Sequence, residues 1–444
     1  MTTEKPTETK VQEAQTAALE IAGLSDQARA DALHSIADAI DANRDEILAA
    51  NEKDVREAEE LLEAGEYSQA LVDRLRLSPS KLESITEMVR SVAAQEDPLG
   101  KTQTARRLDE GLELYRCTVP LGVVGTVFES RPDALVQIAS LCLRSGNAVI
   151  LKGGSEASHS NRVLFDCIAD ATADVPDGWV QLIEARADVD TVLEMDDAID
   201  LVMPRGSSEF VSYIQNNTNI PVLGHTEGVC HVYVDTAADI SMATDIAYDA
   251  KVQYPAVCNA VETLLVHEDV AEEFLPSIAA EYEDAGVEMR GDDAAREIVG
   301  MEPATQDDWG TEYGDLVVAI KVVESLTAAT RHITTYGSKH TDSIVTDDTA
   351  RAGRFMRSLD SASVFHNAST RFADGYRYGL GAEVGISTGK THARGPVGLD
   401  GLTTYQYYLE GDGQCVGTYT GADAKPFVHE DFEGSWTPGS LSEE

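Results

Sequence analysis

The sequence predicts an α/β protein with mostly parallel sheets, and three observations support this class. A helical pattern covers residues 11–94, short apolar runs alternate with helical segments from residue 123 onward, and glycine-containing turns join them. Strands that alternate with helices form parallel sheets with helices on both faces. A chain of 444 residues is long enough for roughly two to four domains.

The amino-terminal region is expected to be helical, because apolar residues recur there at helical spacing. Ile36, Ile40 and Ile47 are expected to share one face. The turn-forming run Asp-Pro-Leu-Gly at 97–100 ends this region. The alternating run 112–119 that follows is typical of a β-strand.

Two α/β stretches then follow. The first predicts strands at 123–128, 148–152, 180–183 and 201–203, and helices at 135–144, after Ser155 and after Val189. The second extends from the strand-like run 231–235 to about residue 383. From residue 421 the chain is rich in glycine, proline, serine and acidic residues, and this end is expected to be mobile.

The formal net charge of −44 is the extreme feature of the composition. Acidic residues occur along the whole chain, so the imbalance is not confined to a tail. Such a field repels nucleic acid and anionic membrane surfaces, and neither is an expected partner. Since salt screens this repulsion at short range, the charge predicts adaptation to high salt; an acidic surface without special meaning is the alternative.

The cysteines and the amino terminus indicate the compartment. Six cysteines occur without a CxxC pair or zinc-type spacing, so we expect free thiols in a reducing cytosol and no metal site. The first residues are polar, and no apolar run approaches the roughly 20 residues of a membrane helix. The sequence therefore predicts a soluble cytoplasmic protein.

Cys258 is the candidate nucleophile. It lies between a predicted helix at 246–251 and a strand-like run at 262–267, where a loop can present a thiol to substrate. The alternative is a packing role, which is common for cysteine. A thiol needs a lowered pKa or a neighbouring base to attack at neutral pH. His225 and Glu227 are candidates for that base, with structural or substrate-orienting roles as alternatives.

Three turns after predicted strands could bind anions. Arg131 follows the strand 123–128, at the sheet edge where α/β folds bind ligands, and it suits a phosphate or carboxylate; a surface ion pair with Glu129 is the alternative. Lysine, glycine amides and a helix start meet at 152–156, although neither GxGxxG nor a phosphate-loop signature applies. A plain turn with a solvated lysine is the alternative there. A third turn at 204–209 suggests the second wall of a nucleotide pocket.

Taken together, the motifs identify a family. They are Pro120–Gly125 with Glu129–Pro132, Ser145–Glu156, Pro204–Gly206, Val229–Asp235, Val257–Ala260, Asn367–Phe372, Gly381–Thr388 and His392–Leu399. In this order they resemble the gamma-glutamyl phosphate reductases, or glutamate-5-semialdehyde dehydrogenases, of the aldehyde dehydrogenase superfamily. The resemblance covers roughly residues 11–413.

The resemblance implies an aldehyde dehydrogenase-like fold. Its parts would be a Rossmann-type NADP-binding domain, an α/β catalytic domain, a small β oligomerisation flap and a mobile acidic tail. In this chain they would span 1–110 with 123–227, 228–384, 111–122 with 385–420, and 421–444, respectively. Such a flap implies a homo-oligomer, either a dimer or a tetramer.

The resemblance also implies a reaction, the NADPH-dependent reduction of L-glutamyl 5-phosphate to L-glutamate 5-semialdehyde in proline biosynthesis. Cys258 would form a thioester and release phosphate. The implied cofactor-binding residues are Lys152, Ser155, Gly206, Ser207 and Glu312. Ser155 stands where NAD-preferring relatives often carry a glutamate, and this favours NADP.

For the substrate, the candidates are Arg131, Asn367, Ser369, Thr370 and Arg371, with an interdomain ion pair as the alternative for Arg371. His225 stands where oxidising relatives carry the glutamate that activates water, which argues against thioester hydrolysis. The alternatives are an NAD-dependent semialdehyde dehydrogenase that forms a free acid, and a non-catalytic acidic binding protein. The chain is too short to include a kinase domain, so glutamate 5-kinase would be a separate, transient partner.

Overall fold

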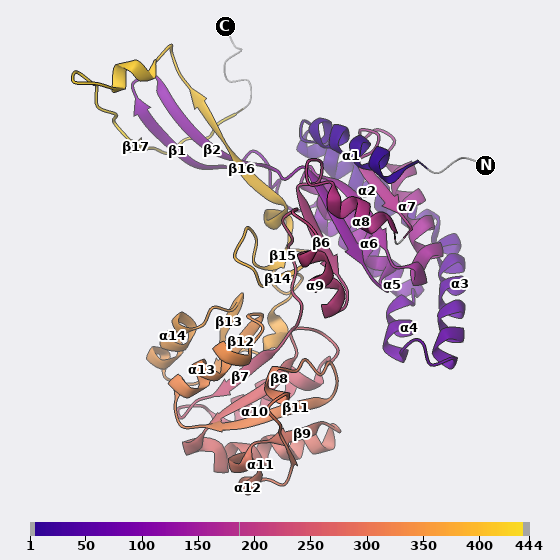
Figure 1. Cartoon of the computed structure of the whole chain (residues 1–444), viewed down its shortest axis with the longest axis vertical. Helices are drawn as coiled ribbons and strands as arrows, with labels where there is room; N and C mark the ends of the chain where they lie inside the picture. The colour runs from indigo at the N-terminus through magenta and orange to yellow at the C-terminus, as the bar shows by residue number, and fades with distance from the viewer. Residues whose placement is uncertain (1–4, 186, 438–444) are drawn as a thin grey trace.

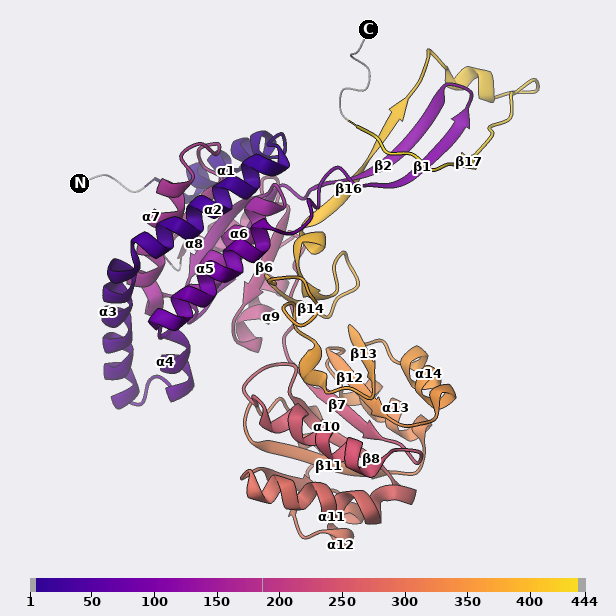
Figure 2. The ribbon, with the colours of Figure 1, turned by 180° about the vertical axis from the view of Figure 1, so that it is seen from behind.

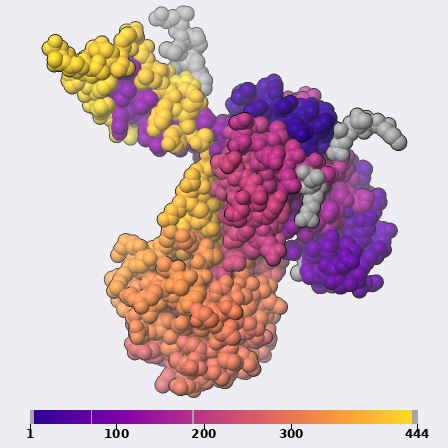
Figure 3. All heavy atoms as spheres, viewed as in Figure 1, coloured from indigo at the N-terminus to yellow at the C-terminus, as the bar shows by residue number. Residues whose placement is uncertain are grey.

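The computed structural model describes residues 5–185 and 187–437 and confirms the α/β class. Two lobes, each with its own parallel sheet, lie one above the other, and an antiparallel sheet projects away from both (Figures 1 and 2). We call these parts the first lobe, the second lobe and the arm. In the space-filling view the arm stands clear of the lobes, which meet along a narrow region (Figure 3).

The first lobe begins with five helices, as the periodicity predicts. They are α1 (Thr7–Ile21), α2 (Asp26–Ala42), α3 (Arg44–Glu63), α4 (Gln69–Leu75) and α5 (Pro79–Ala93). The prediction that Ile36, Ile40 and Ile47 share one helix face is wrong, because α2 ends at Ala42 and Ile47 belongs to α3. All three are nevertheless fully buried in the core of this lobe.

The sheet of the first lobe has the strand order β5-β4-β3-β6, and all its pairs are parallel. Its elements are β3 (Val123–Phe128), α6 (Pro132–Arg144), β4 (Ala148–Gly153), the 3₁₀ helix η1 (Ser155–Ala157), α7 (Ser158–Ala171), β5 (Val180–Ile183), α8 (Ala187–Glu194), β6 (Leu201–Arg205) and α9 (Ser208–Asn216). Every residue of β3 and β4 is buried, as expected of parallel strands covered on both faces.

The second lobe has a seven-stranded parallel sheet of order β10-β9-β11-β8-β7-β12-β13. Its elements are β7 (Cys230–Val234), α10 (Ile240–Val252), β8 (Val261–His267), α11 (Glu268–Asp284), β9 (Glu288–Gly291), α12 (Asp293–Ile298), β10 (Glu302–Pro303), η2 (Asp308–Gly310), β11 (Val317–Val323), α13 (Leu326–Tyr336), β12 (Thr341–Val345), α14 (Thr349–Ser358), β13 (Ser363–His366) and η3 (Thr370–Phe372). Its cores lie on both faces of the sheet.

The arm is larger than predicted. Its sheet has the order β16-β2-β1-β17, formed by β1 (Thr102–Asp109), β2 (Leu112–Pro120), β16 (Thr403–Glu410) and β17 (Glu430–Asp431), with η4 (Leu399–Leu402) and η5 (Val416–Tyr419) beside it. The predicted boundary at residue 110 is therefore wrong, because β1 pairs with β2 in a hairpin and belongs to the arm. Gly111, with a φ of 64°, supplies the left-handed conformation that the tight turn requires.

Two further boundaries change. The tail after residue 421 is packed on the arm rather than mobile where the structure describes it: β17 pairs with β1, and the Trp436 ring stacks on Tyr408 at 3.8 Å. Residues 438–444 lie outside the described residues. The strands β14 (Gly385–Ser387) and β15 (Gly395–Val397) form a separate pair between the lobes instead of joining the arm.

No helix among the described residues has the length and apolar character needed to cross a bilayer. All six cysteines are free thiols, and Cys258 is one of the two that are not buried.

Candidate active site

A cleft of about 790 Å³ lies where the two lobes meet. The first lobe contributes the segments that follow β3 and β6, and the second contributes the loop before β8. β4 and β6 pair with opposite edges of β3. The order in which successive strands are added to the sheet therefore reverses at β3. Ligands of open α/β sheets bind at the carboxyl ends of strands at such a switch point, so the topology places a nucleotide site here.

Cys258 lies in this cleft, partly exposed, on a loop whose two ends are fixed. Lys251, in the last turn of α10, and Glu262, on β8, form an ion pair of 2.7 Å between Nζ and Oε2, and both side chains are fully buried. Burial raises the pKa of Glu262 to about 7 and lowers the pKa of Lys251, while the attraction between them opposes both shifts. The pair closes the base of the loop that presents the thiol.

Arg371 also binds the loop that carries Cys258. Its Nε donates to Gln253 Oε1 at 3.0 Å, and its Nη1 donates to Asn259 Oδ1. Burial lowers the pKa of Arg371. The interdomain ion pair considered for Arg371 does not form with any described residue, because both of its partners are neutral amides. Arg371 therefore positions the Cys258 loop and also lines the cleft.

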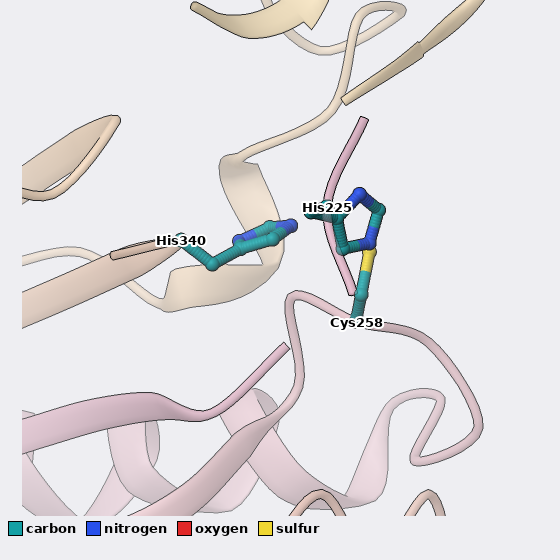
Figure 4. Close-up of side chains that lie close together, drawn as sticks. All are labelled: His225, Cys258 and His340. Atoms are coloured by element: carbon teal, nitrogen blue, oxygen red, sulfur yellow. The ribbon is translucent and has the colours of Figure 1, made fainter. Parts of the chain in front are cut away.

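His225 lies directly beside Cys258 (Figure 4). Its Nδ1 is 2.9 Å from the carbonyl oxygen of Ile386, which can only accept, so Nδ1 carries a proton. In the neutral ring Nε2 is then unprotonated, and Figure 4 shows that ring nitrogen next to the sulfur. An imidazole in this arrangement can take the thiol proton. Glu227, the other candidate base, is exposed and does not line the cleft.

The sequence did not single out His340, which completes this group. The residue immediately precedes β12 and is 1% exposed. Its ring centroid is 5.2 Å from that of His225 in an edge-on arrangement. One ligand atom each of His225, Cys258 and His340 lie within 4.8 Å of one another. A histidine outside any motif gives no local signal, so only the fold reveals this neighbour.

Arginines concentrate in the cleft despite the acidity of the chain. Arg131 lines it together with Arg74 and Arg205, which the sequence did not single out. Burial, and then the charge of Arg131, lower the pKa of both Arg74 and Arg205. The Arg131 guanidinium makes no hydrogen bond or ion pair with any described residue, and Glu129, its considered partner, instead accepts from the Ser207 N–H at 3.1 Å. Such a cationic group suits a phosphate.

Gly206 and Ser207 form the turn into α9, as predicted, and both line the cleft. Ser207 caps the helix, since its Oγ accepts from Phe210 N at 3.4 Å. A Cβ at Gly206 would lie 2.5 Å from Glu129 Oε2, so a larger residue here would displace the Glu129 carboxylate from the turn. The Glu129 carboxylate on the Ser207 amide shows that this helix start accepts an anion.

Of the three other predicted cofactor residues, one lines the cleft and two do not. Lys152 is a buried residue of β4, one position before the strand ends, and Ser155 is exposed on η1; neither lines the cleft. Glu312 does line it, and its Oε2 accepts from the Gly228 N–H at 2.9 Å. Gly228 in turn packs against the Cys258 backbone so closely that a Cβ would lie 2.1 Å from the Cys258 oxygen. Glu312 thus holds the 225–228 segment against the cysteine loop.

The predicted substrate residues between positions 367 and 371 also lie partly inside and partly outside the cleft lining. Only Arg371 lines the cleft. The Asn367 side chain bonds the backbone N–H and carbonyl of Thr346 at 2.9 and 3.1 Å, and Ser369 Oγ accepts from the Arg371 N–H at 3.3 Å. Thr370 is fully buried. Asn367, Ser369 and Thr370 therefore shape the segment that carries Arg371, and the structure does not bring them to the cleft.

Comparison with known proteins agrees with this fold and site. The model of the aldehyde dehydrogenase family matches residues 1–306, and the chain belongs to that family, whose fold implies a nicotinamide cofactor. It is 75% identical over 434 residues to a gamma-glutamyl phosphate reductase of Natronomonas pharaonis, covering 97% of this chain and 99% of the relative. It is 68% identical over 437 residues to one of Haloquadratum walsbyi, covering 97% and 96%. Within the aldehyde dehydrogenases it belongs to the gamma-glutamyl phosphate reductases.

A solved structure supports the same assignment. The crystal structure of gamma-glutamyl phosphate reductase from Thermotoga maritima matches with a TM-score of 0.89 and 39% identity, covering 93% of this chain and 100% of that one. The chain is thus an oxidoreductase of the aldehyde dehydrogenase family.

Proposed function

We propose that the chain reduces L-glutamyl 5-phosphate to L-glutamate 5-semialdehyde with NADPH, releases phosphate, and so performs the second step of proline biosynthesis. The names of its relatives support the substrate. The observation that carries the chemistry is the Cys258 thiol, held in the cleft beside the unprotonated nitrogen of His225.

In the proposed first step His225 Nε2 takes the proton of Cys258, and the thiolate attacks the acyl carbon of the substrate. The carbon–oxygen bond to phosphate breaks, phosphate leaves with the electron pair, and a Cys258 thioester remains. The Cys258 backbone N–H would stabilise the developing oxyanion. Arg131, with Arg205 beside it, would bind the phosphate, because two guanidinium groups can neutralise its charge.

The cofactor would be NADPH, held at the turn of Gly206 and Ser207. Bound there, it would supply the hydride that reduces the thioester carbonyl; the carbon–sulfur bond would then break, with its electron pair returning to Cys258 Sγ, as the aldehyde leaves. Lys152, Ser155 and Glu312 remain the proposed contacts to its other parts. Ser155 itself carries no charge that would repel a 2′-phosphate, which favours NADP over NAD, and the acidic residue of η1, Glu156, accepts from the Ser130 N–H.

Suppression of hydrolysis is the second part of the proposal. His225 stands in place of a water-activating glutamate, and its ring is held by the Ile386 carbonyl. Glu227, the other candidate for that role, lies outside the cleft lining. Once His225 holds the Cys258 proton it cannot take one from water, so the thioester is then available to hydride and phosphate rather than to water. This favours the reductase over an NAD-dependent dehydrogenase that forms a free acid.

Phosphate dependence tests the proposal directly. In the reverse direction, with glutamate 5-semialdehyde and NADP, reduction of NADP should require phosphate or arsenate. Turnover without either would contradict the assignment and support the free-acid alternative.

Cys258→Ala should abolish turnover and leave NADPH binding, measured by its fluorescence, intact. Cys230→Ala is the matched control, because Cys230 is a buried thiol whose Sγ lies 3.2 Å from the Cys258 carbonyl oxygen. His225→Gln should lower kcat by about 10²- to 10⁴-fold, the usual contribution of a general base. Activity that survives Cys258→Ala would exclude Cys258 as the nucleophile.

We also propose that the arm forms a homo-oligomer. Strand β16 is an edge of the arm sheet, and an exposed edge offers unpaired backbone groups to another copy. Tyr405, Tyr407 and Leu409 alternate along β16 and are each at least half exposed. An apolar row of this kind on a free edge is typical of an interface.

A further inference from the structure

The cluster of Cys258, His225 and His340 has the composition of a metal site. We propose that it binds a divalent cation of the zinc class, and that this binding reversibly inhibits the enzyme. The inference uses side chains of the proposed active site, but binding itself does not depend on the reaction that they perform. Because the three residues are far apart in the sequence, their spacing led us to expect no metal there.

The ligand set favours zinc over magnesium or calcium. One thiolate and two imidazoles are borderline-soft ligands, whereas magnesium and calcium prefer oxygen. Zinc bonds of roughly 2.0–2.3 Å at tetrahedral angles place neighbouring ligand atoms about 3.3–3.6 Å apart. The three atoms already lie within 4.8 Å of one another. Closing the widest separation by at most about 1.5 Å would complete the geometry. The cleft leaves a fourth position for water.

Both histidines are oriented as metal ligands usually are. A ligating imidazole commonly donates its second ring N–H to an oxygen, which fixes the ring and its tautomer. His225 Nδ1 donates to the Ile386 carbonyl at 2.9 Å, and His340 Nδ1 lies 2.9 Å from Thr341 Oγ1. In each ring Nε2 is left as the atom for a metal.

The Nε2 atom of His340 is an independent indication. It is buried and has no hydrogen-bond partner among the described residues. Buried polar atoms are normally paired, and one that is not calls for an explanation. Figure 4 shows the outer end of this ring directed toward His225 and Cys258. A cation at the centre of the cluster would satisfy it.

Binding and inhibition both follow from the replacement of the Cys258 thiol proton by the cation. The cation forms a bond to Cys258 Sγ, the thiol loses its proton to solvent, and no electron is transferred. The sulfur lone pair that would attack the acyl phosphate is then held by the metal. The net charge of −44 also raises the local concentration of cations around the protein.

Binding is tested with cobalt(II), whose thiolate complexes absorb light. Titration of Co²⁺ into the full-length protein should produce a thiolate-to-cobalt absorption band that Zn²⁺ abolishes by displacement. Cys258→Ala should remove the band. His340→Gln should weaken Co²⁺ binding by at least about 100-fold, because loss of even an outer-shell partner typically costs about 10- to 100-fold.

His332→Gln is the matched control. His332 is also buried with an unpartnered Nε2 among the described residues, but its ring neighbours are Trp309, Tyr336 and His231 rather than the cysteine. This variant should bind Co²⁺ as the unmodified chain does. A band that survives Cys258→Ala, or that His332→Gln weakens as much as His340→Gln, would overturn the site. So would loss of the band in Cys230→Ala, which would place the metal on the neighbouring thiol.

Inhibition is measured separately from binding. With inhibition measured relative to the metal-free turnover of each protein, His340→Gln should require at least about 100-fold more Zn²⁺ for half-inhibition than the unmodified chain. Equal sensitivity of the two proteins to Zn²⁺ would overturn the inhibitory role. Since the cobalt band needs no substrate, a failure of the proposed reaction would leave the band in place, and a failure of the metal site would leave turnover in place.

Discussion

The buried pair of Lys251 and Glu262 allows a quantitative test of how the cysteine loop is held. Both side chains are fully buried, and the only other described partners of their charged ends are the Asp315 carbonyl and the Gly314 N–H. Removing one member of such a pair leaves a buried charge without a counterion. The two single variants, Lys251→Met and Glu262→Gln, should both destabilise the protein, but with opposite dependence on pH.

In Lys251→Met the glutamate can avoid an unpaired charge by taking up a proton. The cost of that protonation rises with pH above the ordinary glutamate pKa of 4.5, to at most about 1 kcal/mol at pH 5 and about 3 kcal/mol at pH 7. The folded-state pKa is raised, so the native state binds the proton more tightly than the unfolded chain. Stability is therefore greatest at low pH and is lost as the pH rises.

In Glu262→Gln the lysine must lose its proton instead. The cost falls as the pH approaches the ordinary lysine pKa of 10.5, from at most about 5 kcal/mol at pH 7 to about 3 kcal/mol at pH 8. The native state now binds the proton less tightly than the unfolded chain. Stability is therefore lost as the pH falls, the reverse of the first variant.

The assay is denaturant unfolding from pH 5 to pH 8 at constant salt, with Lys251→Met/Glu262→Gln as the reference. That double variant keeps the shape of both side chains without a titratable group, so its own pH dependence reports the rest of the protein. Relative to it, Lys251→Met should lose stability with rising pH and Glu262→Gln should gain it. Parallel pH dependences, or losses below about 0.5 kcal/mol in both single variants, would refute the coupled buried pair.

Two further predictions concern the cleft and the arm. Arg131→Ala should raise the KM for glutamyl phosphate by about 10- to 100-fold, the range expected for loss of a hydrogen bond to a charged group, with smaller effects for Arg131→Lys; an unchanged KM would exclude a phosphate contact. Tyr405→Asp/Tyr407→Asp should shift the protein to smaller assemblies in light scattering, because like charges would face each other across a paired edge; an unchanged mass would place the interface elsewhere.

Several predictions depended on local patterns and are confirmed by the structure. The parallel sheets were predicted from short apolar runs that alternate with helical segments. The turn at Gly206 was predicted from a glycine between a strand and a helix. Cys258 could be selected from its place between two regular elements and from the motifs around it, and it lies in the cleft. NADP preference, the high-salt interpretation of the charge, the cytoplasmic location and contact with glutamate 5-kinase stay predictions.

The tail shows where local patterns mislead. Composition predicts mobility after residue 421, yet β17 pairs with β1 because the arm offers a strand edge there. The wrong boundary at residue 110 has the same kind of cause, because β1 pairs with β2 along its other edge. Strand pairing depends on which segments the fold brings side by side. The composition of a segment carries no information about its neighbours in space.

By itself, the sequence determined the fold class and the family and singled out Cys258 as the candidate nucleophile, because the signals for each are carried by residues that are close together in the chain. The tertiary structure alone decided which groups surround Cys258. Arg205 reaches the cleft and His340 reaches Cys258 from different elements, while Asn367 and Ser369 are held away from the cleft by bonds to the backbone. Side chains far apart in sequence meet only after two sheets have packed, so their contacts follow from topology and not from spacing.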